Sequence, residues 1–323
     1  MKQRESLIVA ALMALILAGC GVGPIRQAKI GEKYVLEIWR PQWTGDGKSV
    51  VFDTDAWHRE SRIALGPGGG GNAPTNPTRR REVMIVSVDD GKVRKLSDGY
   101  GCWVLPSRGL VAYLEPRTVP IGGTPPGIPA GKETRILWLH DPTSGERTSV
   151  CESVSAFTVS SDESLLSYRS EGREYLVFID RPTEVVDLSE KMKAHAAPGY
   201  WSRQWTKDGQ LFLRAQAEGA PKPTWYRFNP KNAAIERAGA PAASRIHDWD
   251  KEIVHWERQR GRPSPDGKRH VTVTRRSTET TEGTTRVKGQ KVSVTLKAEI
   301  DNLVLSGPDG REMPLTDLPP PWR

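Results

Sequence analysis

Known catalytic signatures are missing from this chain of 323 residues. It contains no G-x-S-x-G elbow, H-E-x-x-H helix, C-x-x-C pair or P-loop, so serine-hydrolase, zinc-protease, dithiol and nucleotide chemistry have no support in the sequence. After the apolar run from Leu7 to Leu17, no second run is long enough to span a bilayer. We therefore expect one domain that binds rather than catalyses, without a cofactor and without a metal.

Cysteine is also scarce, with three in the whole chain. Cys20 ends the N-terminal apolar run, which leaves Cys102 and Cys151 as the remaining thiols. In an oxidising compartment an even remainder favours one disulfide, whereas two unbonded thiols satisfy the same count. Spacing does not show whether the two Cα atoms come within bonding range, so the sequence leaves both alternatives open.

The N-terminus has the three parts of an export signal, because Lys2 and Arg4 precede the apolar run and small residues end it at Cys20. The last four residues, Leu-Ala-Gly-Cys, resemble the lipobox of bacterial lipoprotein precursors. The resemblance implies cleavage after residue 19, acyl chains on Cys20 and a permanent membrane anchor. Because Gly21 follows the cysteine, it also implies the outer membrane, facing the periplasm, in a Gram-negative host.

The chain is basic, with 47 Lys and Arg residues against 39 Asp and Glu residues. An exported protein rarely meets nucleic acid, so we expect no nucleic-acid partner. Anionic lipid headgroups, lipopolysaccharide or an acidic envelope protein fit the charge better. Solvated charge that only keeps the chain soluble is the alternative.

One unit recurs five times along the chain. Each copy begins with an aromatic or proline-led strand, continues through a turn that carries Asp or Gly, and enters a short apolar strand, as expected for a tight hairpin. These first hairpins are Pro41–Phe52, Trp103–Tyr113, Phe157–Tyr168, Gln204–Leu213 and Pro263–Val273. A second hairpin follows each of them, with turns at 89–92, 141–145, 180–183, 229–232 and 308–310. Two hairpins per unit predict a four-stranded antiparallel sheet.

The turn of the fifth unit, Ser264–Lys268, reads Ser-Pro-Asp-Gly-Lys. Thr44–Lys48 and Thr206–Gln210 follow the same pattern, whereas Ser107–Gly109 has lost the acidic residue. These units resemble the repeats of TolB-like (WD40-like) β-propeller proteins over nearly all of the chain after Tyr34. The resemblance implies an all-β fold of four-stranded antiparallel blades. An ordinary β-sandwich with Asp-Gly turns is the alternative.

The number of blades follows less directly. The segment Ile246–Trp256 is typical of one more hairpin, which predicts six blades, five of them clear and one degenerate. Lys33–Trp39 precedes the first unit and is expected to join the last sheet and close the ring. The predicted organisation is a signal peptide at 1–19, a lipidated N-terminus and tether at 20–33, a propeller at 34–318 and a proline-rich tail at 319–323.

Long inserts interrupt three units at 64–81, 115–133 and 276–291. The first two are rich in Gly and Pro and lack apolar periodicity, so we expect loops that gather at one mouth of the ring. Arg79, Arg80 and Arg81 end the first insert, whose sequence holds no acidic residue. The triplet fits an acidic partner, and solvated charge is the other interpretation.

A few further residues have the chemistry of a site. His247, Asp248, Asp250 and His255 are potential metal ligands, but they alternate with apolar residues, and we interpret the segment as core. The tryptophans at repeat positions, such as Trp43, Trp103 and Trp205, are better explained by blade packing than by a sugar-binding platform.

The leading hypothesis is a lipid-anchored β-propeller of the cell envelope, a non-catalytic protein-interaction module that binds through a loop-rich face. The alternative is a propeller enzyme, or a binder of small ligands or metals, that uses the central channel. A channel lined with carboxylates would favour the alternative.

Overall fold

The computed structural model describes residues 26–65, 72–73, 78–120, 131–195, 201–216, 222–247, 262–287 and 290–318. The predicted signal peptide, the lipid-attachment residue Cys20 and the proline-rich tail lie outside these residues. No helix in the described ranges is long and apolar enough to cross a membrane.

The predicted repetition of four-stranded antiparallel sheets is confirmed. Three such sheets follow one another along the chain. Their strands are β6 (Tyr100–Leu105), β7 (Leu110–Pro120), β8 (Gly131–His140) and β9 (Arg147–Cys151); β10 (Val154–Val159), β11 (Leu165–Ser170), β12 (Arg173–Phe178) and β13 (Arg181–Asp187); and β14 (Trp201–Trp205), β15 (Leu211–Ala215), β16 (Thr224–Asn229) and β17 (Ala234–Ala238). A short helix, α2 (Leu188–Lys193), follows β13, and a 3₁₀ turn, η1 (Ala243–Arg245), follows β17.

The first and fifth units share a nine-stranded sheet. Its strands are β1 (Arg26–Trp43), β2 (Ser49–Leu65), β3 (Asn72–Ala73), β4 (Thr78–Ser87), β5 (Val93–Asp98), β18 (Arg262–Pro263), β19 (His270–Val287), β20 (Gln290–Ser306) and β21 (Glu312–Pro314). The two units are joined where residues 31–36 of β1 pair in parallel with residues 295–300 of β20. The prediction that the segment before the first unit joins the last sheet is thus confirmed. Residues 26–33, which the sequence assigned to the tether, are part of β1.

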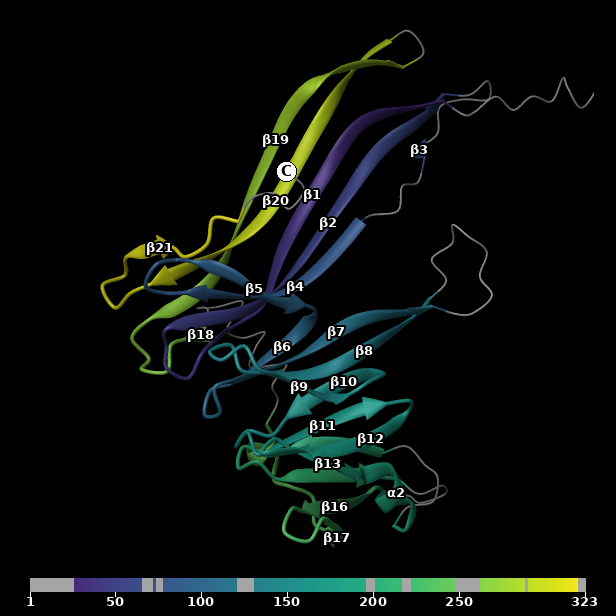
Figure 1. The fold of residues 1–323 in the computed structure, drawn as a ribbon, viewed down its shortest axis with the longest axis vertical. Helices are drawn as coiled ribbons and strands as arrows, with labels where there is room; N and C mark the ends of the chain where they lie inside the picture. Colours follow the sequence, from purple (N-terminus) through teal and green to yellow (C-terminus); the bar gives the residue numbers. More distant parts are fainter. Residues whose placement is uncertain are drawn as a thin grey trace, which may run out of the picture.

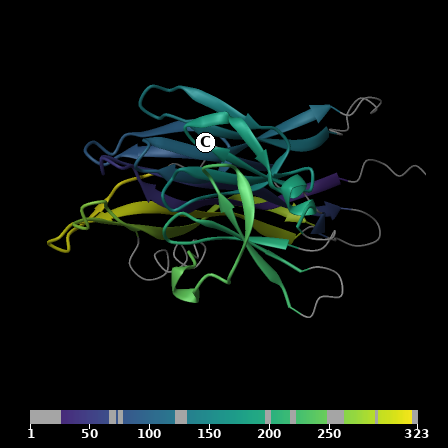
Figure 2. The ribbon, with the colours of Figure 1, turned by 90° about the horizontal axis from the view of Figure 1, so that it is seen from below.

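The sheets follow one another along an arc in a propeller-like arrangement (Figure 1). The nine-stranded sheet lies at one end and the β14–β17 sheet at the other, and Figure 2 looks along the arc from the β14–β17 end. Most of the segment expected to form a degenerate sixth blade, 248–261, lies outside the described residues. Six blades and a closed ring therefore stay predictions.

The turns inside the first hairpins pack against one another from sheet to sheet. A Cβ atom added to Gly45 would lie 2.1 Å from the carbonyl oxygen of Pro106, so this close approach requires glycine. The backbone N–H of Ser107 donates to Glu163 at 2.9 Å, which connects the next pair of sheets. The turns predicted from the sequence thus reverse the chain and also connect neighbouring sheets.

The repeat-position tryptophans are buried, as predicted. Trp43, Trp103 and Trp205 are 4%, 8% and 4% exposed. The indole N–H of Trp43 donates to the carbonyl oxygen of Arg262 at 2.8 Å, and that of Trp205 donates to the hydroxyl of Thr158 at 3.0 Å. Each of these indoles therefore joins its own unit to a neighbouring one.

The described parts of the three long inserts are strand, and residues 66–71, 74–77, 121–130 and 288–289 of them lie outside the described residues. β7 and β8 stay paired out to Pro120 and Gly131, and β19 and β20 out to Val287 and Gln290. β2 likewise continues to Leu65. As a result β1, β2, β19 and β20 run on together as a long ribbon beyond the stack of sheets (Figure 1). Both faces of this ribbon carry polar residues, so its strands lack the alternation of apolar and polar residues by which a strand is predicted.

The two remaining cysteines lie on opposite edges of one sheet. Cys102 is on β6 and Cys151 on β9, with β7 and β8 between them. Three strand spacings place their backbones roughly 14 Å apart, beyond the ~7 Å limit for a disulfide. Both thiols are free, so the structure has two thiols where the sequence allowed one disulfide.

Alkylation distinguishes these two thiols. Cys151 is partly exposed and should react with iodoacetamide in the native protein, whereas Cys102 is fully buried and burial raises its pKa well above the usual value. Denaturation without a reductant should expose both to label. A mass spectrum in which the two residues stay unlabelled until reductant is added would contradict this arrangement.

Candidate functional site

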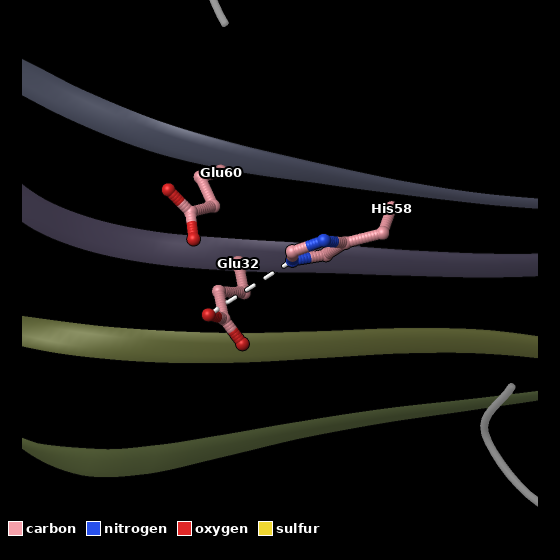
Figure 3. Close-up of side chains that lie close together, drawn as sticks. All are labelled: Glu32, His58 and Glu60. Atoms are coloured by element: carbon pink, nitrogen blue, oxygen red, sulfur yellow. Dashed lines mark ion pairs between the residues drawn. The ribbon is translucent and has the colours of Figure 1, made fainter. Parts of the chain in front are cut away.

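One group of metal-ligand residue types lies on the ribbon. Glu32 of β1 and His58 and Glu60 of β2 bring ligand atoms within 4.8 Å of one another (Figure 3). The Lys29 ammonium and the Tyr34 hydroxyl already engage the Glu32 carboxylate, the latter at 2.6 Å. These two contacts outweigh the effect of burial and lower the pKa of Glu32.

The other members of this group are also engaged. The His58 ring stacks on Tyr34 with centroids 4.4 Å apart, and Glu60 pairs with Arg62. A metal would have to displace the Lys29 cation from Glu32. We therefore interpret the group as an ion-pair and stacking cluster that holds β1 to β2, and not as a metal centre.

A groove of about 560 Å³ lies among the described residues. It runs along the first strands of successive units, touching the end of β1 and then β6, β10 and β14. Trp103, Phe157 and Trp205 contribute aromatic surface from three different sheets. β6, β10 and β14 are each the edge strand of a four-stranded sheet, so the groove follows the inner edges of the stack.

Arg40 lines this groove from a strained position in β1. Its φ of 53° lies in the left-handed region, which side chains other than glycine seldom occupy. The strain coincides with a break in the β1–β2 register between Trp39 and Gln42, a β-bulge. The neighbouring Trp39 is 48% exposed although its ring is apolar. Strained backbone is common at functional sites, so the strain at Arg40 next to the exposed Trp39 ring favours a binding role for this part of β1.

Arg203 lines the groove from β14 and is paired underneath. It contacts the carboxylate of Glu174, which is only 4% exposed and also accepts a hydrogen bond from Arg169 Nε at 2.6 Å. Burial lowers the pKa of Arg203, and the adjacent Glu174 opposes this effect. Two guanidinium groups share one buried carboxylate, so a positive charge is left at this end of the groove.

The next residue along β14, Gln204, adds an unused acceptor. Its side-chain oxygen is buried and has no hydrogen-bond partner among the described residues. Buried polar atoms are almost always paired, so an acceptor of this kind in a groove favours a ligand that carries N–H or O–H donors.

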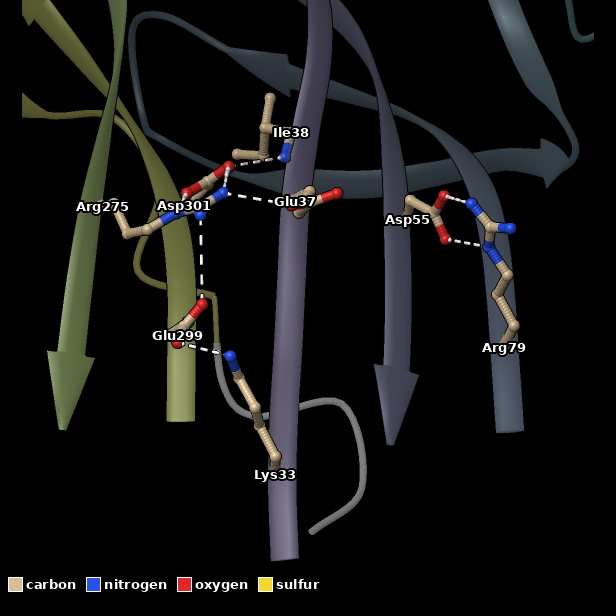
Figure 4. A network of polar contacts seen from close by, with 8 residues as sticks. All are labelled: Lys33, Glu37, Ile38, Asp55, Arg79, Arg275, Glu299 and Asp301. Carbon is tan, nitrogen blue, oxygen red and sulfur yellow. Dashed lines mark hydrogen bonds and ion pairs between the residues drawn. The ribbon is translucent and has the colours of Figure 1, made fainter. Parts of the chain in front are cut away.

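A smaller cavity of about 300 Å³ shares Arg40, Tyr100 and Gly101 with the groove. Arg79 on β4 reaches Asp55 on β2 through two hydrogen bonds, one of them 2.7 Å from Nε to Oδ1 (Figure 4). Arg81 approaches the same carboxylate at 3.4 Å. Burial would raise the pKa of Asp55, but the two arginines bring it below its usual value.

The arginine triplet is therefore placed differently from the sequence expectation. Arg79, Arg80 and Arg81 lie within strand β4 and not at the end of a loop. Arg80 pairs with Glu82 at 2.5 Å, while its two neighbours share Asp55. The acidic counterpart comes from outside the insert, on the adjacent strand β2, and for this reason the insert sequence did not reveal it.

Asp53 on β2 joins the first unit to β6 of the second unit by hydrogen bonds. This 4% exposed carboxylate accepts the backbone N–H groups of Gly101 at 2.7 Å and Cys102 at 3.0 Å. Burial raises its pKa to about 6, and the hydrogen bonds oppose that rise only in part. Gln42 makes two more hydrogen bonds between the same units, because its side chain donates to the Cys102 carbonyl oxygen at 2.9 Å and accepts the Val104 N–H at 3.1 Å.

The groove residues that sequence reasoning missed do have a sequence signal. Arg203 stands two positions before Trp205, so on an alternating strand it shares the side of the leading aromatic. Arg40 stands three positions before Trp43, and the bulge between Trp39 and Gln42 brings Arg40 to the groove. Of the predicted metal-type cluster, His247 lines the groove, and Asp248, Asp250 and His255 lie outside the described residues.

Comparison with known proteins adds resemblance at low identity. No family model matches the chain, and no curated protein matches it in sequence. The oligogalacturonate lyase of Vibrio parahaemolyticus is 12% identical with a TM-score of 0.36, over 90% of this chain and 86% of the lyase. TolB of Acinetobacter baumannii is 14% identical with a TM-score of 0.31, over 88% of this chain and 69% of TolB. The β-propeller domain of the Trilobed protease of Pyrococcus furiosus is 10% identical with a TM-score of 0.39, over 86% and 82%. These values assign no function.

Proposed function

We propose that this chain is a non-catalytic binding module of the cell envelope, anchored by lipid at Cys20, that holds an extended acidic protein segment in its groove. The observation that carries the proposal is the charge of the groove. Its described lining includes Arg40, Arg203 and His247 and no carboxylate. Guanidinium groups with neighbouring aromatic rings are suited to bind carboxylates.

The length of the groove favours a chain over a small molecule. Sheets pack about 10 Å apart, so a groove across the β6, β10 and β14 edges spans roughly 20 Å. An extended segment of about six residues covers that distance. The Gln204 oxygen supports the same ligand, because a peptide N–H would satisfy it. In the full proposal, residues 248–261 supply a sixth unit and the loop tips flank the bound segment.

The absence of carboxylates from the described groove lining also bears on the enzyme alternative. Hydrolysis of a glycoside by the usual mechanism needs a pair of carboxylates, one that acts as the acid and one that acts as the base or nucleophile. Asp53 and Asp55 line the smaller cavity beside the groove. Asp53 is buried and already accepts two backbone N–H groups, and Asp55 is paired with Arg79 and Arg81. Binding is therefore the better supported role.

Arg40 provides the test. Arg40→Gly should relieve the backbone strain at this position, because glycine adopts a φ of 53° without strain, and the relief should offset the loss of the side chain's own contacts in the free energy of unfolding. The same substitution should weaken binding of a fluorescein-labelled octapeptide of alternating Glu and Ser by about tenfold, because a charge-assisted hydrogen bond is lost. Denaturant titration gives the stability, and fluorescence polarisation gives the affinity.

Matched variants separate charge from shape. Arg40→Lys should keep part of the affinity, and Arg237→Gln, an exposed change on β17, should keep all of it. A Lys-Ser octapeptide should not bind. Equal affinity for the acidic and basic peptides would overturn the proposal, and equal affinity for free glutamate and the octapeptide would favour a small-ligand site instead.

A further inference from the structure

The far end of the ribbon, which we call the ribbon tip, is defined by residues 26–30 and 59–65 of β1 and β2 and residues 282–287 and 290–294 of β19 and β20. Cations face one another across its strands. Lys29 is opposite Arg62, and Arg286 is opposite Lys291. Next to the tip, Lys33 is opposite Arg59 but pairs with Glu299 on β20. Like charges directly opposite on neighbouring strands destabilise a sheet.

Only part of this repulsion is relieved within the protein. Lys29 pairs with Glu32 and Arg62 with Glu60. Arg286 and Lys291 are exposed, and neither has an ion-pair partner among the described residues. The ribbon tip contains two acidic residues in its sequence, Glu60 and Glu282. A sheet end that keeps opposed cations at a cost to its own stability is suited to contact an anionic surface.

The position of the tip indicates which surface that is. β1 begins at Arg26, only six residues after Cys20. Six residues span at most about 20 Å, so the anchor proposed above would hold this end of the ribbon close to the bilayer. The opposite end of the molecule, at β16 and β17, would point away (Figure 1).

We propose that the ribbon tip is a membrane-docking surface that binds anionic phospholipid headgroups and sets the orientation of the protein on the bilayer. The proposal rests on lipid attachment at Cys20. Between Lys29 and Trp39, β1 runs for about ten residues, or roughly 33 Å. A docked tip would therefore hold the groove well clear of the headgroups, where a partner can reach it.

Vesicle binding without the acyl chains tests the surface itself. The mature chain from residue 20, with Cys20→Ser, is sedimented with vesicles of one part phosphatidylglycerol to three parts phosphatidylcholine, and with phosphatidylcholine alone. Binding is expected to the anionic vesicles only, and to weaken as salt rises. Each basic residue near an anionic surface contributes about fivefold to partitioning, so Arg286→Gln with Lys291→Gln should lower it by about 25-fold.

A matched double variant at the other end of the molecule controls for net charge. Lys231→Gln with Arg237→Gln removes the same charge from exposed positions near β16 and β17 and should leave partitioning unchanged. Equal binding to both vesicle types, or an equal loss in the two double variants, would overturn the docking surface. Lipid attachment is read separately from the mass of the N-terminal peptide of membrane-extracted protein. Unmodified Cys20 would refute the anchor and leave the vesicle result standing.

Discussion

Replacing Asp301 with alanine is expected to lower the free energy of unfolding by about 3 kcal/mol. Asp301 on β20 is 5% exposed and accepts hydrogen bonds from the backbone N–H of Ile38 at 3.1 Å and from Arg275 Nε at 2.7 Å (Figure 4). Alanine would leave a buried N–H without its acceptor and a guanidinium without its main partner. Denaturant unfolding followed by tryptophan fluorescence measures the loss.

Two further variants show where that energy lies. Asp301→Asn keeps one oxygen that can accept the Ile38 N–H, but it loses the charge and the second acceptor oxygen that faces Arg275, so we expect an intermediate loss. Asp309→Ala removes an exposed carboxylate from the turn before β21 and should change stability by less than about 0.5 kcal/mol. If Asp301→Ala proved as mild as Asp309→Ala, the Asp301 network would not be holding β1 to β20.

The hairpins were predictable because their signals are local. In the first unit, the Asp46 carboxylate accepts the Thr44 hydroxyl at 2.7 Å and the Lys48 N–H at 3.0 Å. The fifth unit repeats this at Asp266, which accepts from the Ser264 hydroxyl and the Lys268 N–H. Side chains that bond the backbone two residues away form a turn wherever they occur, so sequence alone locates it.

The ribbon and the groove depend on distant partners. Ile38 and Asp301 are 263 positions apart. The repeat predicts that the segment before the first unit joins the last sheet, but neither local sequence indicates which residues of β1 and β20 pair. The groove likewise combines Arg40 with Arg203 from sheets at separate places along the arc. Which residues of different sheets become neighbours depends on how the sheets stack. The spacing of the repeats predicts the sheets but not these contacts. The bulge at Arg40 also shifts the β1–β2 register, and no Gly, Asn or Asp at this position indicates it in the sequence.

Asp53 is expected to make the protein less stable as pH rises from about 4 to about 6. The ordinary pKa of its carboxyl is 3.8, and burial raises it to about 6 in the folded state. Between these values the folded state holds a proton that the unfolded state has released, so unfolding becomes easier as pH increases. A difference of about two units corresponds to roughly 3 kcal/mol, lost by about pH 6 and constant above it.

Asp53→Asn isolates this contribution from the rest of the chain. Asp55, Asp46 and Asp266 have lowered pKa values and give stability the opposite dependence, so the wild-type curve alone combines both. The asparagine oxygen still accepts an N–H from β6 but does not ionise. Wild type minus variant, measured by denaturant unfolding from pH 4 to pH 7, should fall by roughly 3 kcal/mol. A flat difference would mean that Asp53 stays ionised in the folded protein and that its two N–H donors outweigh burial.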